Sequence, residues 1–443
     1  MARIVPFRGL RYDPSRVDMR EVVAPPYDVI NDEERDFLHD RHPNNVVWLE
    51  KGKDLPGDGP GENKYARAGR LLKQWIASGM LRYDQKPSIY IYEQEYQYSS
   101  ERPRLRRGFL ALARLEDQES GVILGHEHTM MPPKVDRLNL MKECKANLSP
   151  IFSLYSQPDG SIDSILVEAA FTSPVYDFRD DKNIRNRFWV VNDPAVIRSI
   201  TSQMENKSLI IADGHHRYET ALIYRHIRRS EGKSSSEDAP YNYVMMLFVN
   251  LEGEGVSIYP IHRIIHGLER FEPGQFQRQI EKYFERTEYP FTCANCETVA
   301  RNFSADMARV GETRHAFGLY LGGNALELLT SRDDIALREF VERDHCESFR
   351  TLDVAIAQAV ILQKILGIDT QNLSKEEHVR FTPSSDSALE AVRRGEAQIA
   401  LLLNPTKPEQ VKAVTYEGEK MPQKSTYFYP KLLSGLVMNR FES

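Results

Sequence analysis

The segment from Ile210 to Leu222, IIADGHHRYETAL, holds the residues best suited to chemistry. An apolar strand is predicted just before Asp213, and the apolar residues after position 217 have the i, i+3, i+4 spacing of an amphipathic helix. Gly214 can adopt backbone conformations that other residues resist, so the chain is expected to turn there. The turn would expose free N–H groups at a helix start, and such a start attracts anions.

The side chains of this turn add to that prediction. Arg217 offers a planar fork suited to phosphate or carboxylate. His215 and His216 can exchange protons near neutral pH. Asp213 could cap the helix, orient a histidine or hold a metal. We predict a functional turn with phosphate as the leading ligand. The alternative is a plain turn and helix cap.

A second candidate is GHEHTMMPPKVDR at residues 125–137, where Glu127 lies between two histidines at a predicted strand end. Side chains alternate along a strand, so Glu127 is expected to point away from both histidines. H-E-x-x-H is not present, which excludes a zincin. Glu127 or a histidine is predicted as general acid or base, and Lys134 and Arg137 as sources of positive charge. A solvated loop is the alternative.

A third candidate is MPQKSTYFYPK at residues 421–431. Lys424, Ser425 and Thr426 look like the end of a phosphate loop, but no glycine directly precedes the lysine, so this is not a Walker A motif. The lysine and two hydroxyls could still line an anionic or nucleotide pocket. The alternative is a strand near the end of the chain that packs its aromatic residues into the core.

Three shorter motifs are more ambiguous. In APPYDVI, Asp28 is as suited to capping a helix predicted at residues 31–38 as to acting in a site. YPIHR at residues 259–263 places a His-Arg pair after a predicted strand. Cys293 and Cys296 form a C-x-x-C motif without two further ligands at matched spacing, so incidental thiols are favoured over zinc or redox use, and any metal remains unknown.

Composition limits the class of protein. The chain has 443 residues, 41% of them hydrophobic, and a formal net charge of −6. Nucleic-acid binding is disfavoured by that charge, and neither a membrane-spanning run nor a secretory apolar segment is present in the sequence. Four cysteines do not form a disulfide framework, so a reducing, cytoplasmic location is expected. Oligomeric state is not predictable.

Helical and strand patterns occur throughout, which indicates an α+β (mixed α/β) chain. We expect domains at 1–240 and 241–443, or one interwoven domain. Strands are predicted at residues 88–96, 208–212, 243–249, 316–321 and 398–403, and helices at 66–76, 276–284, 352–366, 388–394 and 408–414.

Together these motifs resemble the bacterial and archaeal family carrying domain of unknown function 1015. APPYDVI, GHEHTMMPPKVDR, IADGHHRYETAL, YPIHR and MPQKSTYFYPK match in order over nearly the whole chain. The D-G-H-H-R turn also resembles the phosphate-binding turn of the ParB/sulfiredoxin superfamily, which includes free-serine kinases using ADP or ATP. The resemblance implies a ParB-like phosphate-binding core with additional mixed-sheet subdomains.

By that resemblance, Gly214, His215, His216 and Arg217 would cradle nucleotide phosphates. The implied function is a phosphoryl-transfer enzyme, kinase-like or phosphatase-like, that uses ATP or ADP with Mg²⁺ on a small hydroxy metabolite such as serine or phosphoserine. Asp213 or Glu127 would be the base. The alternatives are a nucleotide-sensing regulatory protein without turnover and a nucleic-acid-associated ParB-like protein.

Overall fold

The computed structural model describes residues 2–98, 103–232, 236–333, 335–369 and 377–441. It divides into two compact units, of which the first is Met1–Ser257 with Pro430–Ser443 and the second is Ile258–Tyr429. The boundary therefore differs from the one expected at residue 240. The strand that follows that position, β12 (Tyr243–Asn250), pairs with strands of the first unit, and the last segment of the chain returns to the same unit.

The first unit is built on a nine-stranded mixed sheet with the order β6-β11-β8-β12-β5-β4-β10-β9 and β1 paired to β5. The β11–β6 and β12–β8 pairs are parallel, and the others are antiparallel. The remaining strands of this sheet are β1 (Ile4–Val5), β4 (Ile89–Tyr96), β5 (Arg104–Arg114), β6 (Ile123–Gly125), β8 (Ile151–Tyr155), β9 (Tyr176–Arg179), β10 (Arg185–Val191) and β11 (Leu209–Asp213).

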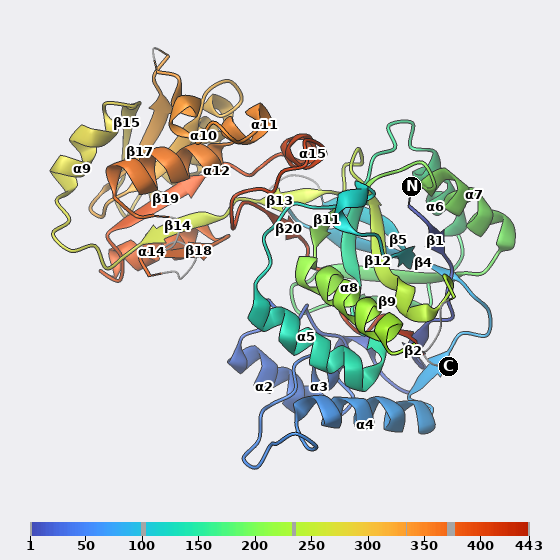
Figure 1. Cartoon of the computed structure of the whole chain (residues 1–443). Coiled ribbons are helices and arrows are strands. Elements are labelled where there is room, and N and C mark those ends of the chain that lie inside the picture. The colour runs from blue at the N-terminus through green and yellow to red at the C-terminus, as the bar shows by residue number, and fades with distance from the viewer. Residues whose placement is uncertain (1, 99–102, 233–235, 334, 370–376, 442–443) are drawn as a thin grey trace. The chain divides into compact units, whose positions relative to one another are not determined.

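Helices cover this sheet, and their apolar residues join its core. Tyr218 and Ala221 of α8 are buried in one cluster with sheet residues such as Ile211 and Phe248, as the helical spacing predicted. Helix α5 packs against both α8 and α4 (Figure 1). The helices of this unit are α1 (Met19–Val22), α2 (Asp32–Arg41), α3 (Val47–Glu50), α4 (Lys64–Ala77), α5 (Met131–Cys144), α6 (Ser161–Ala169), α7 (Pro194–Met204) and α8 (His215–Ser230), with 3-10 turns η1 (Gln118–Ser120) and η2 (Pro240–Asn242).

The end of the chain is tied to the first unit by short pairings. β21 (Asn439–Arg440) pairs antiparallel with β7 (Ala146–Asn147), and single bridges join Leu10 to Met438 and Ala24 to Ser434. Two further two-stranded sheets pair β2 (Leu10–Tyr12) with β3 (Leu81–Tyr83) and β13 (Ser257–Tyr259) with β20 (Tyr427–Tyr429).

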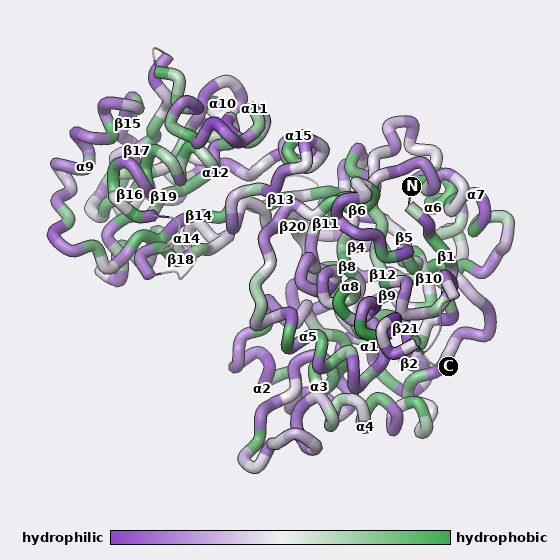
Figure 2. The backbone as a smooth tube through the Cα atoms, in the orientation of Figure 1, coloured by the Kyte–Doolittle hydropathy of each residue, from purple (hydrophilic) through white to green (hydrophobic). Residues whose placement is uncertain are grey.

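The second unit contains a six-stranded sheet with the order β15-β17-β16-β19-β14-β18, all of whose pairs are antiparallel. Hydrophobic residues concentrate in the sheet strands of each unit (Figure 2). The elements are β14 (His262–Ile265), β15 (Phe284–Pro290), β16 (Ala316–Tyr320), β17 (Ala325–Ser331), β18 (Val379–Thr382), β19 (Ile399–Leu403), α9 (Pro273–Ile280), α10 (Cys296–Val310), η3 (Leu337–Phe340), α11 (Glu347–Arg350), α12 (Asp353–Ile356), the π-helix η4 (Ala357–Ile365), α14 (Ser385–Arg393) and α15 (Pro408–Tyr416).

The mixed α/β prediction is confirmed, with one large mixed sheet and one antiparallel sheet. The five predicted strands correspond to β4, β11, β12, β16 and β19. The helix predicted at 276–284 ends at Ile280, because the chain then enters β15. Among the described residues, no helix combines the length and the apolar character needed to cross a membrane.

Candidate functional site

The predicted turn lies between β11 and α8. Gly214 has φ = +96° and occupies the N-cap of α8, where no side chain caps the helix. The N–H of Tyr218 donates to the Gly214 carbonyl at 3.0 Å and closes the first helical turn. The amides before it have no acceptor within the helix, which is the general property of a helix start that makes it receptive to anions.

Replacing Gly214 with alanine is expected to destabilise the first unit by more than the ~1–2 kcal/mol that a left-handed conformation costs an L-residue. The added Cβ would lie 3.0 Å from guanidinium atoms of Arg217, so that side chain would also have to move. Gly160→Ala is the matched control, since Gly160 has φ = +62° at the N-cap of α6 and a Cβ added there would meet nothing within 4 Å. Equal losses in urea unfolding would contradict the close contact.

Asp213 is held between two cations. Its Oδ1 lies 2.9 Å from Nζ of Lys431, and its Oδ2 lies 3.2 Å from Nη2 of Arg217. Arg217 is 8% exposed and also donates to the carbonyl of Pro150. Burial would raise the pKa of Asp213, but Lys431 and Arg217 outweigh it and lower the pKa to about 2. Asp213 is therefore a permanently charged anchor at neutral pH, and Arg217 acts mainly by positioning it.

Lys431 reaches this site because its backbone is fixed. Nε2 of Gln94 donates to the carbonyl of Lys431 at 3.2 Å, and Nη2 of Arg106 donates to the carbonyl of Pro430 at 2.5 Å. Lys431 is the last residue of the MPQKSTYFYPK motif, and the sequence interpretation did not select it. The motif contained Lys431 as a possible cation, but nothing in the sequence indicated that Lys431 pairs with Asp213.

The sequence left two roles open for Asp28, a cap for the following helix and a residue of the site. Helix α2 is capped by Asn31 in a capping box with Glu34, so Asp28 does not cap it. The Asp28 residue is exposed to solvent. Although the residue is exposed, the protein atoms that surround its carboxyl group raise its pKa, as does the negative charge of Asp213, while Arg217 and Lys431 act in the opposite direction. Asp28 thus lies close enough to Asp213, Arg217 and Lys431 to interact electrostatically with all three.

The loop that carries Asp28 is held in place by hydrogen bonds to its backbone. Nζ of Lys51 donates to the carbonyl of Tyr27 at 3.1 Å and also to that of Ile30. The N–H of Val29 donates to the carbonyl of Pro26 at 3.1 Å and closes the turn. These contacts fix the backbone on both sides of Asp28, so its carboxyl is presented from a defined position.

Glu127 and the histidines are arranged differently from the prediction. β6 ends at Gly125, so the alternation expected for residues 126–128 does not apply. His126 and Glu127 instead both contact His215: the two imidazole rings are 4.6 Å apart at 88°, and Oε2 of Glu127 lies 3.4 Å from Nδ1 of His215. Burial would raise the pKa of Glu127, but the nearby imidazoles of His215 and His126 lower it to about 2.

Backbone donors define the protonation of both histidines of the turn. The N–H of His126 donates to Nε2 of His215 at 3.2 Å, and the N–H of Met130 donates to Nε2 of His216 at 3.0 Å. An amide can only donate, so Nε2 must carry the lone pair and the neutral ring carries its proton on Nδ1. Burial lowers the pKa of His216. Both rings therefore hold the 125–130 loop against the start of α8.

Stability of the first unit is expected to fall with acid because of His126. This residue is 2% exposed, and burial together with His215 lowers its pKa to about 3. The unfolded chain takes up the proton near pH 6.5 and the folded chain does not, so stability present above pH 6.5 is lost as the pH falls toward 3, by up to ~1.4 kcal/mol per pH unit. Urea unfolding at pH 7.5, 6.5 and 5.5 measures this slope, which His126→Asn should reduce; an unchanged slope would contradict it.

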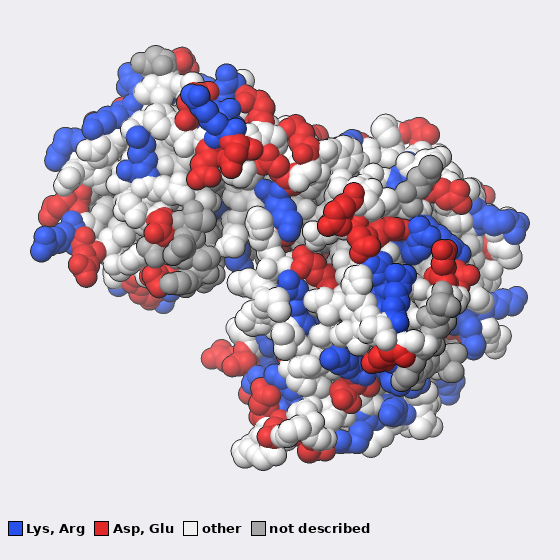
Figure 3. Space-filling view, in the orientation of Figure 1, with Lys and Arg blue, Asp and Glu red and all other residues white. Residues whose placement is uncertain are grey.

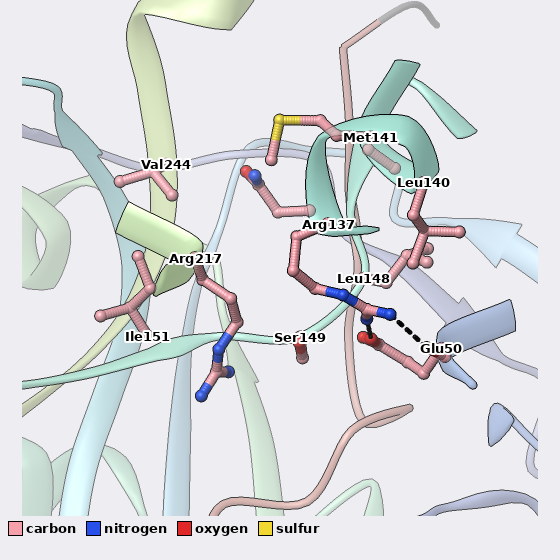
Figure 4. A pocket seen from close by; sticks show the side chains of 11 residues that line it. Glu50, Arg137, Leu140, Met141, Leu148, Ser149, Ile151, Arg217 and Val244 are labelled. Carbon is pink, nitrogen blue, oxygen red and sulfur yellow. Dashed lines mark hydrogen bonds and ion pairs between the residues drawn. The ribbon is translucent and has the colours of Figure 1, made fainter. Parts of the chain in front are cut away.

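Two predicted cofactor ligands are ion-paired within the protein. Nζ of Lys134 lies 2.9 Å from Glu219, and Nη1 of Arg137 lies 2.9 Å from Oε2 of Glu50 (Figure 4). The Arg137 guanidinium also lies 3.9 Å from the centroid of the Tyr27 ring. Both cations connect helices and loops around the site, and their charges are already balanced.

Arg137, Glu50 and Arg217 share a small cavity of about 40 Å³ (Figure 4). Nε of Arg217 and Oε1 of Glu50 are buried without a hydrogen-bond partner among the described residues. The volume suits about one water molecule, which could bond to these atoms. It is too small for a nucleotide or a metabolite.

The remaining predicted residues belong to the second unit. Lys424 is exposed and has φ = +55°. The Oγ of Ser425 donates to the Pro422 carbonyl at 2.5 Å, and the next residue, Thr426, is half-buried. Cys293 and Cys296 are free thiols. Within the described ranges, a group of three potential metal ligands with atoms within 4.8 Å of one another occurs only at Glu342, Asp344 and His345.

Asp213 acts electrostatically on both Asp28 and Glu127, and we call these three first-unit residues the carboxylate cluster. Two cations, Arg217 and Lys431, oppose these three carboxylates, so with neutral histidines the site carries a net negative charge. A phosphate group alone would be repelled there, whereas one accompanied by a divalent cation would not. On the face shown in Figure 3, acidic and basic side chains are interspersed rather than gathered into one basic field.

The fold and this cluster define a mixed α/β protein with an acid-rich site at a helix start. The chain belongs to the family described as "Protein of unknown function (DUF1015)", which matches residues 4–355. This agrees with the resemblance seen in the sequence motifs. A comparison with curated proteins found no match.

Several solved structures are distantly similar. A conserved hypothetical protein from Pyrococcus furiosus has a TM-score of 0.34 at 12% identity, covering 75% of this chain and 96% of its own. A free serine kinase in complex with AMP has a TM-score of 0.33 at 13% identity, covering 74% and 92%. A C-terminally truncated SbnI from Staphylococcus aureus has a TM-score of 0.33 at 12% identity, covering 74% and 86%. TM-scores this low do not establish a shared fold.

Proposed function

We propose that the first unit transfers a phosphoryl group between a nucleotide, ATP or ADP, and a small hydroxy metabolite such as serine. The observation that supports this most is the placement of Asp28, an exposed residue whose carboxyl group has a raised pKa, beside the ion-paired Asp213 at the start of α8. Phosphoryl transfer requires positioned charge and a base more than covalent catalysis by the protein. The ParB-like phosphate-binding core is part of the same proposal.

The roles follow from exposure and charge. Asp28 accepts the proton of the acceptor hydroxyl, whose oxygen forms a bond to the terminal phosphorus as the bond from phosphorus to the nucleotide breaks. The free amides at the start of α8 face the phosphate, and Asp213 holds Lys431 beside it. His215 and His216 position the 125–130 loop and Glu127.

Asp213 and Glu127, whose pKa values are both lowered to about 2, are ionised at neutral pH and suited to Mg²⁺. Mg²⁺ usually takes one or two carboxylates and fills its other positions with phosphate oxygens and water, so a preformed cage of three protein ligands is not required. When bound, it would neutralise phosphate charge. This accounts for an anionic substrate in a site of net negative charge.

The test is phosphomonoester formation detected by ³¹P NMR, with ATP or ADP, Mg²⁺ and a panel of small hydroxy metabolites beginning with serine. An acceptor-dependent product that Lys431→Met abolishes is the expected result. Lys182→Met, at an exposed lysine of the same unit, is the matched control and should leave the rate unchanged. Product that persists in Lys431→Met would contradict the assignment, and nucleotide binding without any product would favour a nucleotide-sensing protein.

A further inference from the structure

Arg263 in the second unit is a buried cation without an acidic partner among the described residues. It is 3% exposed and lies on β14, where it pairs with Phe381 of β18 and Leu401 of β19. Its guanidinium donates to the carbonyl of Ile261 and, at 3.4 Å, to that of Lys424, and it lies 5.5 Å from the centroid of the Phe381 ring. Burial alone lowers its pKa, to about 10.

A buried charge is costly unless another charge balances it. Arginine cannot escape this cost by losing its proton, because even the lowered pKa keeps it charged at neutral pH. Three other buried arginines have a carboxylate partner: Arg137 pairs with Glu50, Arg217 with Asp213 and Arg225 with Asp117. Carbonyl dipoles satisfy donors of Arg263 but leave its full charge without a counter-charge.

The turn that accepts from Arg263 carries a second cation. Lys424 is exposed, and the described residues give its ammonium group no ion pair. Its φ of +55° is uncommon for a residue with a side chain and has a real energetic cost. The turn is fixed by the Ser425 hydroxyl, which donates to the Pro422 carbonyl, and by the Thr406 hydroxyl, which donates to the Ser425 carbonyl at 2.9 Å. The fold thus maintains a strained backbone that brings two cationic residues together.

We propose that Arg263 and Lys424 form an anion site in the second unit, which binds a small oxyanion of the phosphate or carboxylate kind. The oxyanion supplies the counter-charge that the protein does not. Arg263 provides a buried guanidinium, and Lys424 provides an ammonium from an exposed residue. The site is built from residues of the second unit alone and does not depend on the proposed phosphoryl transfer.

The experiment titrates the full chain with inorganic phosphate in one arm and acetate in the other, followed by calorimetry in a chloride-free, low-salt buffer. Phosphate could also bind in the first unit, so the comparison is between variants of the second unit. Lys424→Ala is expected to weaken binding of the preferred anion about tenfold, and Arg263→Gln to abolish this binding component. Lys282→Ala, at an exposed lysine of the same unit, should behave as wild type.

Arg263→Gln could disturb folding, so two further variants are tested. Lys424→Ala changes an exposed residue, and Arg263→Lys retains the buried positive charge. Thermal unfolding supplies a second readout, since an anion that binds the folded state raises its stability. Wild type should gain thermal stability with the anion, and Arg263→Gln should not. Wild-type binding of both anions in Lys424→Ala and Arg263→Gln, or no binding by wild type, would overturn the proposal.

Discussion

Asp28→Asn is expected to lower the rate of phosphoryl transfer by about 10²- to 10⁴-fold, the range that a general base contributes. Asparagine has nearly the same shape but cannot accept the proton. It also removes one negative charge from the carboxylate cluster, so the affinity for nucleotide should stay the same or increase. Initial rates with Mg²⁺ and the best acceptor, together with calorimetric nucleotide binding, measure both effects.

The matched control for this substitution is Asp40→Asn, at an exposed aspartate near the end of α2. It makes the same chemical change in the same unit and should leave the rate unchanged. An Asp28→Asn protein that retains its rate within a factor of about ten would rule out Asp28 as the base. A parallel loss of nucleotide binding would instead indicate that Asp28 acts in binding.

Arg137→Met is expected to destabilise the first unit by about 3–5 kcal/mol, because it leaves Glu50 as an uncompensated buried charge. The side chains of Arg137 and Glu50 are only 8% and 3% exposed. Urea unfolding followed by tryptophan fluorescence reports on this unit alone, since the three tryptophans, Trp48, Trp75 and Trp189, all belong to it.

Arg70→Met is the control for this loss, since Arg70 pairs with Glu62 on the surface with both side chains half exposed. Such pairs contribute about 1 kcal/mol or less. The double substitution Arg137→Met with Glu50→Gln should cost less than the sum of the single ones. A small loss of stability combined with a large loss of nucleotide affinity would contradict the structural role and support the prediction from the sequence that Arg137 binds the cofactor.

The local features of the site could be predicted from the sequence. Gly214 signalled a turn because a strand pattern precedes it and a helical spacing follows it, and both elements are present. The prediction that Glu127 points away from the neighbouring histidines was wrong for a local reason too. Strand alternation requires the strand to continue, and β6 ends one residue before His126.

The partners in the site could not be predicted, because they are far apart in the sequence. Lys431 meets Asp213 across 218 positions, and Arg137 meets Glu50 across 87. Charge and residue type show that a partner is needed but not which residue supplies it. The same limit explains the boundary between the units, because the chain's return to its first unit is shown by long-range contacts such as the pairing of β21 with β7 and the bridge between Leu10 and Met438.

The most direct test of the account is the pKa of Asp28, measured by ¹³C NMR of aspartate carboxyl groups, with Asp28→Asn assigning the resonance. The pKa of Asp28 is expected to lie above the ordinary value of 3.8, and to decrease when Asp213→Asn removes the neighbouring negative charge. A pKa at or below 3.8 that Asp213→Asn leaves unchanged would show that the two carboxyl groups do not form one site.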